Sequence, residues 1–257
     1  MKNSTDKKKI IANFSKAARS YDKYADIQKA AACELACRLP DKGFKRILEI
    51  GCGTGIYTAL LNDKFKNAVL KSIDISPEMI SVAKEKFKER RIDFEVADAE
   101  VFDPCGDFDL VTSNACFQWF HDLGVSLRKY KDKLAKDGVF SFSMFGPKTY
   151  WEFNSILSDF YKGSSFQSDE FITKDILFKL LNKYFKAVTV DEVRFCESLP
   201  DLKTLLSKIR NTGTNGRGLN GKFIGSKRLK AIEAGFKEKF GAIKTTHQVF
   251  FCYCHNS

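Results

Sequence analysis

The chain has 257 residues, 44% of them apolar, and contains 24 phenylalanines. This length allows one large domain or two small ones, and the apolar content predicts a sizeable core, which excludes disordered and fibrous classes of protein. No window of about 18 uncharged apolar residues occurs, so we expect no membrane span. The lysine-rich start at Met1–Lys9 is not followed by the apolar stretch of a secretory signal, and we expect a cytoplasmic protein.

The formal net charge is +11, which favours acidic partners such as nucleic acid, an anionic membrane or an acidic protein. The lysines are dispersed and no nucleic-acid-binding motif occurs, so we expect neither nucleic acid nor a membrane as a partner. The eight cysteines are scattered and are expected to remain reduced without an export signal. Cys252, Cys254 and His255 form the only cluster that resembles a metal site, but the alternation of a strand places His255 on the opposite face. We therefore expect no metal.

Strands and helices alternate through most of the sequence. Apolar residues at helical spacing predict two helices within 8–39, ended by Pro40 and Gly43 before a short strand at 46–50. Further strands are expected at 69–73, 93–97, 107–114, 139–145, 187–196 and 245–254. One further helix is expected directly after the first strand, one begins at Ser76, and one contains Leu123, Leu127 and Leu134. Others are expected at 149–161, 173–184 and 201–210, and a last one begins near Ser226 after a loop at 211–221. This order predicts an α/β fold with a mostly parallel sheet and helices on both faces.

The stretch from Ile47 to Gly55 combines a buried strand with a glycine-rich turn that opens a helix. Glycines at 51, 53 and 55 allow positive φ and let a ligand approach the backbone closely. The free N–H groups at the start of the helix favour negative charge. Glu49 precedes the first glycine by two residues and could hold a cationic or amino-bearing ligand near the turn. A glycine-rich turn that binds nothing is the alternative interpretation.

Polar residues end the next three predicted strands. Asp74 follows the second strand, Asp98 and Ala99 follow the third, and Asn114 ends the fourth. Ligands of open α/β sheets bind at the carboxyl ends of the strands, and an acid after the second strand can accept two hydrogen bonds from a ribose. The sequence therefore predicts a nucleoside-type ligand at this edge.

The spacing Glu49-x-Gly51-x-Gly53-x-Gly55, followed by Asp74, Asp98-Ala99 and Asn114, resembles class I S-adenosylmethionine-dependent methyltransferases over residues 44–146. The resemblance implies a Rossmann-like fold with a seven-stranded sheet and a helical lid. It implies S-adenosylmethionine as cofactor and S-adenosylhomocysteine as product. The cofactor-binding residues that it implies are Tyr21, Gln28, Glu49, Gly51, Gly53, Gly55, Asp74, Ile75, Asp98, Ala99 and Asn114.

Two further segments narrow the resemblance. Phe14-x-x-Ala17-Ala18-x-x-Tyr21-Asp22 and Ser113-Asn114-x-x-x-Gln118-Trp119 look like segments of the malonyl-[acyl-carrier protein] O-methyltransferases of biotin synthesis. The resemblance implies that the free carboxylate of a malonyl thioester is methylated, carried by acyl carrier protein or coenzyme A. Glu170 departs from it, since a basic residue useful for a carboxylate is expected there. The substrate-binding residues that it implies are Gln118, Trp119, Lys148, Phe171 and Arg210.

A carboxylate is already ionised near pH 7, so this reaction requires orientation and desolvation and no general base. We therefore assign no catalytic residue, and we expect His121, the histidine nearest the predicted site, to be structural. A basic patch beside the site is expected to dock the acidic carrier protein. Its candidate residues are Lys148, Lys203, Lys208, Arg210, Arg217 and Lys222.

The whole chain is predicted to form one methyltransferase domain. It comprises N-terminal lid helices at 1–43, a cofactor-binding core at 44–146 and a C-terminal half at 147–257, whose stretches near 148–172 and 200–240 are expected to act as lid or substrate segments. Two alternatives remain open. One is a methyltransferase for another small acid, such as trans-aconitate, or for a quinone precursor. The other is a cofactor-binding assembly or RNA-associated factor without catalysis.

Overall fold

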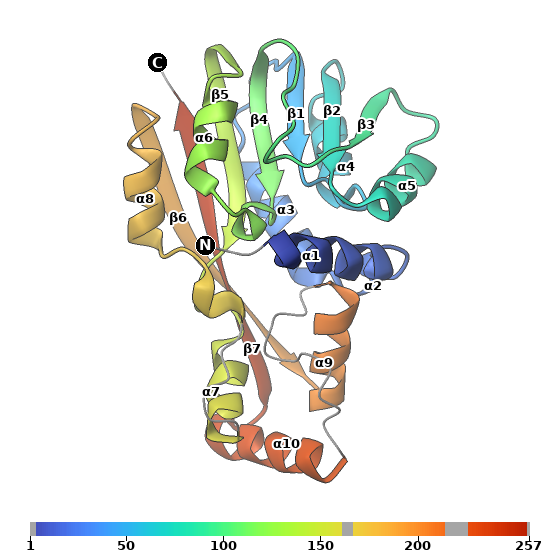
Figure 1. Ribbon diagram of the computed structural model, residues 1–257, viewed down its shortest axis with the longest axis vertical. Helices are drawn as coiled ribbons and strands as arrows, with labels where there is room; N and C mark the ends of the chain where they lie inside the picture. The colour runs from blue at the N-terminus through green and yellow to red at the C-terminus, as the bar shows by residue number, and fades with distance from the viewer. Residues whose placement is uncertain (1–3, 161–166, 214–225, 256–257) are drawn as a thin grey trace.

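The computed structural model describes residues 4–160, 167–213 and 226–255. Its centre is a seven-stranded sheet in the order β3-β2-β1-β4-β5-β7-β6, in which β7 runs antiparallel to both of its neighbours and the other pairs are parallel (Figure 1). The strands are β1 Arg46–Ile50, β2 Val69–Asp74, β3 Ile92–Val96, β4 Phe108–Asn114, β5 Leu134–Phe145, β6 Ala187–Leu199 and β7 Ile243–His255. The mostly parallel α/β fold is confirmed.

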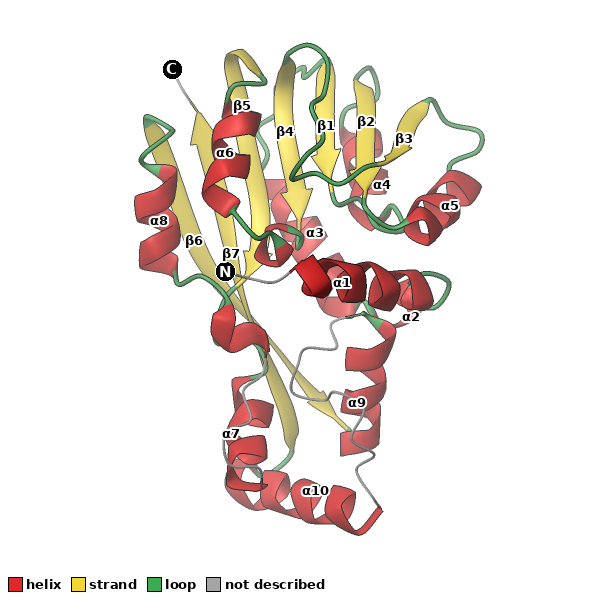
Figure 2. Ribbon diagram, in the orientation of Figure 1, coloured by secondary structure: helices red, strands yellow, loops and turns green. Residues whose placement is uncertain are grey.

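Helices cover both faces of the sheet (Figure 2). The helices are α1 Ser4–Ala17, α2 Tyr21–Tyr24, α3 Asp26–Arg38, α4 Ile56–Lys64, α5 Pro77–Lys86, α6 Leu123–Lys131, α7 Trp151–Phe160, α8 Lys174–Leu181, α9 Leu202–Asn211 and α10 Ser226–Phe240. One large apolar cluster packs α3 and α4 on the sheet, and another packs α6 and α8 on the opposite face. The central strand β1 is buried from Ile47 to Ile50, as expected for a parallel strand covered on both sides. Glu49 is its only polar residue in this range.

Two details of the predicted elements are wrong. The region predicted as two helices at 8–39 forms three, because the chain turns near Ser20 and Ala25. Leu134 does not end a helix. It begins β5 and pairs with Phe108, and the register then shifts before Val139 pairs with Leu110. The strand predicted at 139–145 therefore begins five residues earlier, and Gly138 lies inside it.

The strands β6 and β7 continue beyond the rest of the sheet and carry a second layer of helices (Figure 1). Helices α7, α9 and α10 pack there around a separate apolar cluster that includes Phe153, Leu205, Phe236 and Ile243. The predicted lid or substrate segments at 148–172 and 200–240 fall mainly in this lower layer. The residues at 161–166 and 214–225 lie outside the described part of the chain.

Within the described residues, no helix combines the length and apolar character needed to cross a membrane. The same residues contain no group of three or more His, Cys, Asp or Glu side chains placed to hold a metal ion. The eight cysteines, including Cys252 and Cys254 in β7, are free thiols.

Candidate functional site

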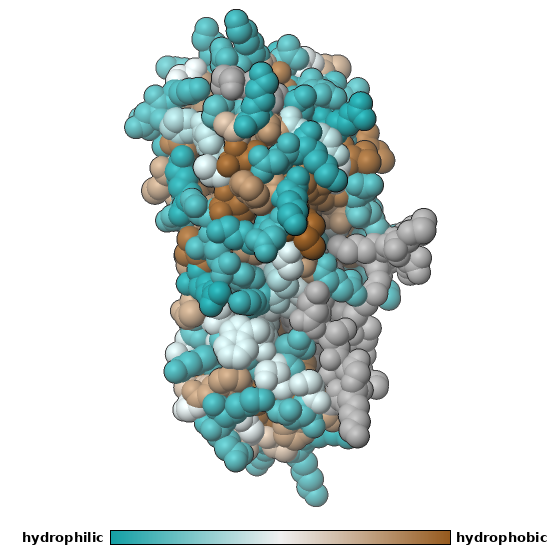
Figure 3. Space-filling view, turned by 90° about the vertical axis from the view of Figure 1, so that its left-hand side faces the viewer, coloured by the Kyte–Doolittle hydropathy of each residue, from teal (hydrophilic) through white to brown (hydrophobic). Residues whose placement is uncertain are grey.

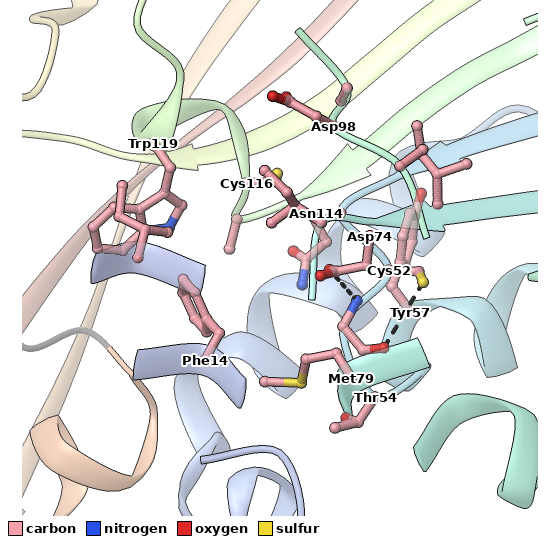
Figure 4. A pocket seen from close by; sticks show the side chains of 18 of the residues that line it. Phe14, Cys52, Thr54, Tyr57, Asp74, Met79, Asp98, Asn114, Cys116 and Trp119 are labelled. Atoms are coloured by element: carbon pink, nitrogen blue, oxygen red, sulfur yellow. Dashed lines mark hydrogen bonds between the residues drawn. The ribbon is translucent and has the colours of Figure 1, made fainter. Parts of the chain in front are cut away.

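A deep cavity lies where the carboxyl ends of β1, β2 and β4 meet helix α1 (Figure 4). Its empty space, including the open mouth, is about 960 Å³, which is within the size range of pockets for small molecules and cofactors. The wall combines apolar and aromatic side chains with a few polar groups. The lining residues include Lys7, Ile10, Phe14, Tyr21, Gln28, Gly51, Gly53, Asp74, Ile75, Met79, Asp98, Ala99, Glu100, Asn114, Cys116 and Trp119.

The glycine-rich turn forms one side of this cavity. Gly51 and Gly53 adopt positive φ, +70° and +55°, which only glycine adopts without strain. The Gly51 N–H donates to the Ile73 carbonyl at 2.8 Å, and the Gly53 N–H donates to Asp74 Oδ2 at 2.9 Å. The turn is therefore fixed against β2, and its backbone without side chains is presented to the cavity.

Asp74 joins this turn to the start of α5. One carboxylate oxygen accepts the Gly53 N–H and the other accepts the Ser76 N–H at 2.8 Å. Burial raises the pKa of Asp74, while these backbone donors act to lower it. A carboxylate oxygen has more than one lone pair, so Asp74 can still accept hydrogen bonds from a ligand in the cavity, toward which it points in Figure 4.

The opposite wall is polar as well. Asn114 donates through Nδ2 to the Gln28 carbonyl at 3.1 Å and accepts at Oδ1 from the Ser143 hydroxyl at 2.6 Å. These bonds fix helix α3 against the ends of β4 and β5. The Asp98 carboxylate lies 2.6 Å from Lys7 Nζ, and Glu100 lies 2.8 Å from the same nitrogen. Lys7 therefore links α1 to the loop that follows β3.

Helices α1 and α2 close the cavity through further polar contacts. The Ser15 and Ser76 hydroxyls are 2.9 Å apart, and Asp22 contacts both Thr54 and Lys86. Burial, followed by the charge of Asp74, raises the pKa of Tyr21, whose phenol stays protonated. The N-terminal helices thus make contact with the loops that follow β1, β2 and β3 at this edge of the sheet.

Aromatic rings form the rim on the side of α1. The ring centroid of Phe14 lies 5.6 Å from that of Trp119, edge to face (Figure 4). It lies 6.4 Å from the ring centroid of Tyr21. Trp119 also makes an edge contact with Phe171 at 6.0 Å. Such ring pairs stabilise beyond their buried area, and here they connect helix α1 to the segment before α8.

Comparisons with known proteins identify the scaffold. Residues 48–142 match the family described as "Methyltransferase domain". The chain is 34% identical over 238 residues to malonyl-[acyl-carrier protein] O-methyltransferase 1 of Ilyobacter polytropus, covering 92% of this chain and 88% of the relative. It is 32% identical to the second enzyme of that name from the same organism, over 96% of both chains.

The chain belongs to the malonyl-[acyl-carrier protein] O-methyltransferase family. The fold agrees with this assignment. A solved phosphoethanolamine N-methyltransferase 2 of Haemonchus contortus, in complex with S-adenosyl-L-methionine, superposes with a TM-score of 0.60 at 19% identity, covering 95% of this chain and 57% of that chain. The sheet is therefore the Rossmann-like sheet of class I methyltransferases.

The cavity of this O-methyltransferase gathers most of the cofactor-binding residues that the sequence predicts. Tyr21, Gln28, Gly51, Gly53, Asp74, Ile75, Asp98, Ala99 and Asn114 all line it. Gly55 and Glu49 do not. Gly55 caps the start of α4, where an added Cβ would meet the ring of Phe87, and Glu49 is buried behind the turn.

The buried carboxylate of Glu49 is held by hydrogen bonds from neighbouring side chains. One of its carboxylate oxygens accepts from the Thr58 hydroxyl at 2.6 Å and the Ser72 hydroxyl at 2.7 Å, which join β1, α4 and β2. Burial raises the pKa of Glu49 to about 7, although both hydrogen bonds act to lower it. Its contacts hold the strand and helix that frame the glycine turn.

This environment predicts a pH-dependent contribution to stability. Because the folded pKa lies above the ordinary value of 4.5, Glu49 favours the folded state most at pH below 4.5, and this contribution is lost as pH rises through about 7. The loss is up to about 3 kcal/mol. In Glu49→Gln, whose amide oxygen can accept the same two hydroxyls, the free energy of unfolding should vary less between pH 5 and 8. Urea unfolding of both proteins across this range measures the difference, and parallel pH profiles would contradict this role of Glu49.

The predicted substrate residues divide into two groups. Trp119 lines the cavity and Phe171 contacts its ring, whereas Gln118 is buried beside it and donates to the Ala115 carbonyl at 2.6 Å. Lys148 and Arg210 do not line the cavity. The Lys148 N–H donates to Gln248 at 2.9 Å, and Arg210 is exposed in the last turn of α9.

Lys208, predicted to be part of the docking patch, is not a free surface cation. Its ammonium contacts Glu197 at 2.5 Å and Asp26 at 3.0 Å, and its side chain is 17% exposed. Burial acts to raise the pKa of Glu197, but the hydrogen bond from Lys208 and the neighbouring His247, whose Nε2 lies 3.6 Å from the carboxylate, lower it to about 2. Arg217 and Lys222 lie outside the described residues.

Several lining residues were not predicted as part of the site. Lys7 reaches the cavity because α1 packs against the loop after β3, which carries Glu100. Cys116 reaches it through a turn that begins at Ala115, whose φ is +53°. Phe14 belongs to a segment that carries the family resemblance, but its place in the wall depends on how α1 packs. Of these four residues, only Cys116 has a local signal in the sequence, because it lies in the turn after the predicted strand end at Asn114.

Proposed function

We propose that this enzyme transfers the methyl group of S-adenosylmethionine to the free carboxylate of a malonyl thioester carried by acyl carrier protein. The observation that carries the proposal is the cavity in which Gly51, Gly53, Asp74, Asp98 and Asn114 converge at one edge of the sheet. Family membership supports the acceptor, since the relatives are named for malonyl-[acyl-carrier protein]. The resemblance to enzymes of biotin synthesis implies that the methyl ester enters that pathway.

The residues present fit this cofactor. A ribose offers two neighbouring hydroxyls, and Asp74 retains acceptor capacity toward the cavity after its two backbone bonds. Asp98 can accept from an adenine amino group, with Ile75, Met79 and Ala99 as apolar neighbours for the ring. The turn at Gly51 and Gly53 presents backbone beside which the methionine part can lie. When bound, the cofactor supplies a methyl group activated by a sulfonium.

The reaction needs no protein base. The malonyl carboxylate is ionised at neutral pH, and one of its oxygens forms the new bond to the methyl carbon while the bond from carbon to sulfur breaks. Burial raises the pKa of Cys116, so this lining thiol stays protonated and does not compete as an acceptor. The protein contributes orientation through Asn114 and the aromatic rim, and it excludes water by closing α1 and α2 over the cavity.

The acceptor is tested by parallel incubations with labelled S-adenosylmethionine. Malonyl-acyl carrier protein, malonyl-coenzyme A and trans-aconitate are offered at equal concentration, and incorporated label is measured over time. We expect the highest kcat/KM for the carrier-bound substrate. Preferential methylation of trans-aconitate would contradict the proposal, and incorporation into none of the acceptors would remove it.

The contacts of α1 and α2 predict that these helices are a lid. Cofactor entry requires them to separate from Asp98, Ser76 and Thr54, and ligand binding should then hold them closed. Amide hydrogen exchange over residues 8–30 should slow by at least about tenfold when S-adenosylhomocysteine binds, because the bound ligand lowers the population of the open lid from which these amides exchange. Exchange in α8, remote from the cavity, is the internal control. Equal exchange of residues 8–30 with and without ligand would show that they are no lid.

A further inference from the structure

Helix α1 has two faces of different chemistry. Its inner face directs Ile10 and Phe14 into the cavity, and Lys7 points to Asp98 and Glu100. Its outer face carries exposed Lys8, Lys9 and Lys16, and exposed Arg19 follows in the turn after the helix. Lys9 and Lys16 are seven residues apart and therefore lie on one side of α1, Lys8 adjoins Lys9, and Arg19 follows just beyond the end of the helix, so these cations share the outside of the lid. We call Lys8, Lys9, Lys16 and Arg19 the lid stripe.

The exposed acid Glu78 of α5 contacts α1 through the Ser15 side chain, but it forms no ion pair with the lid stripe within the described residues. None of the stripe's cations takes part in an ion pair there, in contrast to Lys208 and Lys86, which are paired internally. Asp22, the acid in the neighbouring helix α2, is occupied by Thr54 and Lys86. The charged residues from 7 to 24 that are exposed are all basic, whereas Asp22 is partly buried.

The position of the stripe relates it to the substrate. Because one helix has an inner face in the cavity and an outer face in solvent, a carrier bound to the outer face is within one helix diameter of the cavity, about 10–12 Å. The surface continues onto α9, since the Ser20 hydroxyl donates to Asn211 at 3.4 Å and exposed Arg210 is the preceding residue. The malonyl carboxylate and the phosphodiester of a phosphopantetheine arm are both anionic, so this surface attracts the arm as well as an acidic carrier.

We propose that the lid stripe, extended by Arg210, is the docking surface for the acidic acyl carrier protein that delivers the malonyl thioester. The inference rests on the proposed function. It assigns the partner to the lid and keeps only Arg210 of the predicted docking patch, in which Lys208 is paired. Opposite charge on two surfaces mainly accelerates their encounter, and salt screens it over about 10 Å at 0.1 M. Docking on the lid also places the carrier against the element that must be closed during methyl transfer.

A matched pair of charge-reversal variants tests the proposal. The first is Lys8→Glu/Lys9→Glu/Lys16→Glu. The second is Lys179→Glu/Lys183→Glu/Lys186→Glu, which changes the net charge equally on exposed residues of α8 and the turn after it. Figure 3 views the molecule from the α8 side, where hydrophilic residues cover much of the surface. Initial rates are measured at low salt with malonyl-acyl carrier protein and with malonyl-N-acetylcysteamine, a small thioester without a carrier protein.

The lid variant should lose at least about tenfold in kcat/KM with malonyl-acyl carrier protein and should lose its salt dependence. Its rate with the small thioester and its calorimetric affinity for S-adenosylhomocysteine should equal those of the parent, which shows that the lid still folds. The α8 variant should keep the parent rate with both substrates. Equal losses in the two variants would show that only the net charge of the protein matters, and the docking proposal would be wrong. An unchanged rate in the lid variant would also contradict it.

Binding of a labelled RNA duplex tests whether the partner of the stripe is a nucleic acid. The rates of the parent with the two substrates separate failure of the docking proposal from failure of the proposed function. If the lid variant loses binding to a labelled RNA duplex but keeps the rate with the carrier protein, the stripe is a nucleic-acid surface and the proposal is wrong. If the parent methylates the small thioester but not the carrier-bound one, the docking proposal fails while methyl transfer to a malonyl group survives. If the parent methylates neither, the proposed function fails and the docking surface fails with it.

Discussion

Replacing Asp74 with alanine is expected to weaken S-adenosylmethionine binding by more than about 100-fold. Hydrogen bonds to a charged acceptor contribute about 1.5–3 kcal/mol each, and a ribose would make two. The substitution also removes the acceptors of the Gly53 and Ser76 N–H groups, so the glycine turn loses this attachment to β2. Isothermal titration calorimetry of the folded variant measures the affinity directly.

The chain offers a close control for Asp74. Asp109 Oδ2 also accepts two backbone N–H groups, from Lys45 at 2.8 Å and Arg46 at 2.9 Å, but at the opposite edge of the sheet. Asp109→Ala should therefore lower stability through the same kind of lost bond and leave cofactor affinity unchanged. If Asp74→Ala binds S-adenosylmethionine as tightly as Asp109→Ala does, Asp74 is not a cofactor contact.

Replacing Gly51 with alanine should be the most damaging single methyl addition in the glycine turn. A Cβ at this position would lie 2.3 Å from Cys116 Sγ and 2.6 Å from Cys116 Cβ, and the φ of +70° is itself strained for alanine. Left-handed strain costs about 1–3 kcal/mol, and overpacking costs about 1–3 kcal/mol more. We expect the free energy of unfolding to fall by about 2–6 kcal/mol, the sum of these two costs, measured by urea denaturation.

Gly53→Ala separates the two contributions. Its φ is +55°, but no atom lies within 4 Å of the added Cβ, so only the backbone strain remains. This variant should fold, and because Gly53 lines the cavity its methyl group should reduce cofactor affinity. A Gly51→Ala protein as stable as Gly53→Ala would show that Cys116 does not press against the turn. Cys116→Gly should partly restore the Gly51→Ala protein, since it removes both clashing atoms.

The predictable part of this site is the part encoded locally. Gly51 and Gly53 lie in the turn after the first strand and Asp74 ends the second, all within 24 residues, and the expected topology alone brings them together. Asp98 and Asn114 follow by the same rule, because parallel strands end at one edge. The seven strands are predictable because alternating buried strands and amphipathic helices leave a periodic signal.

The remainder depends on packing that no local pattern records. Lys7 is an ordinary lysine in a lysine-rich segment, and only the path of α1 across the sheet pairs it with Asp98 and Glu100. Glu49 is part of the same motif as the glycines, but Thr58 and Ser72 occupy its carboxylate behind the turn. Lys208 is predicted in the docking patch because it belongs to a predicted lid segment, but its contacts with Asp26 and Glu197 remove it from that role.

The chemistry of the product tests the central proposal most directly. Malonyl-acyl carrier protein is incubated with the enzyme and S-adenosylmethionine, and the intact carrier and its released phosphopantetheine arm are analysed by mass spectrometry, with acetyl-acyl carrier protein as the control that lacks a free carboxylate. We predict that malonyl-carrier protein gains a single methyl group as an ester on the malonyl carboxylate, and that acetyl-carrier protein gains none. A methyl group elsewhere on the carrier, equal methylation of the acetyl form, or no transfer to the malonyl form would contradict the proposed function.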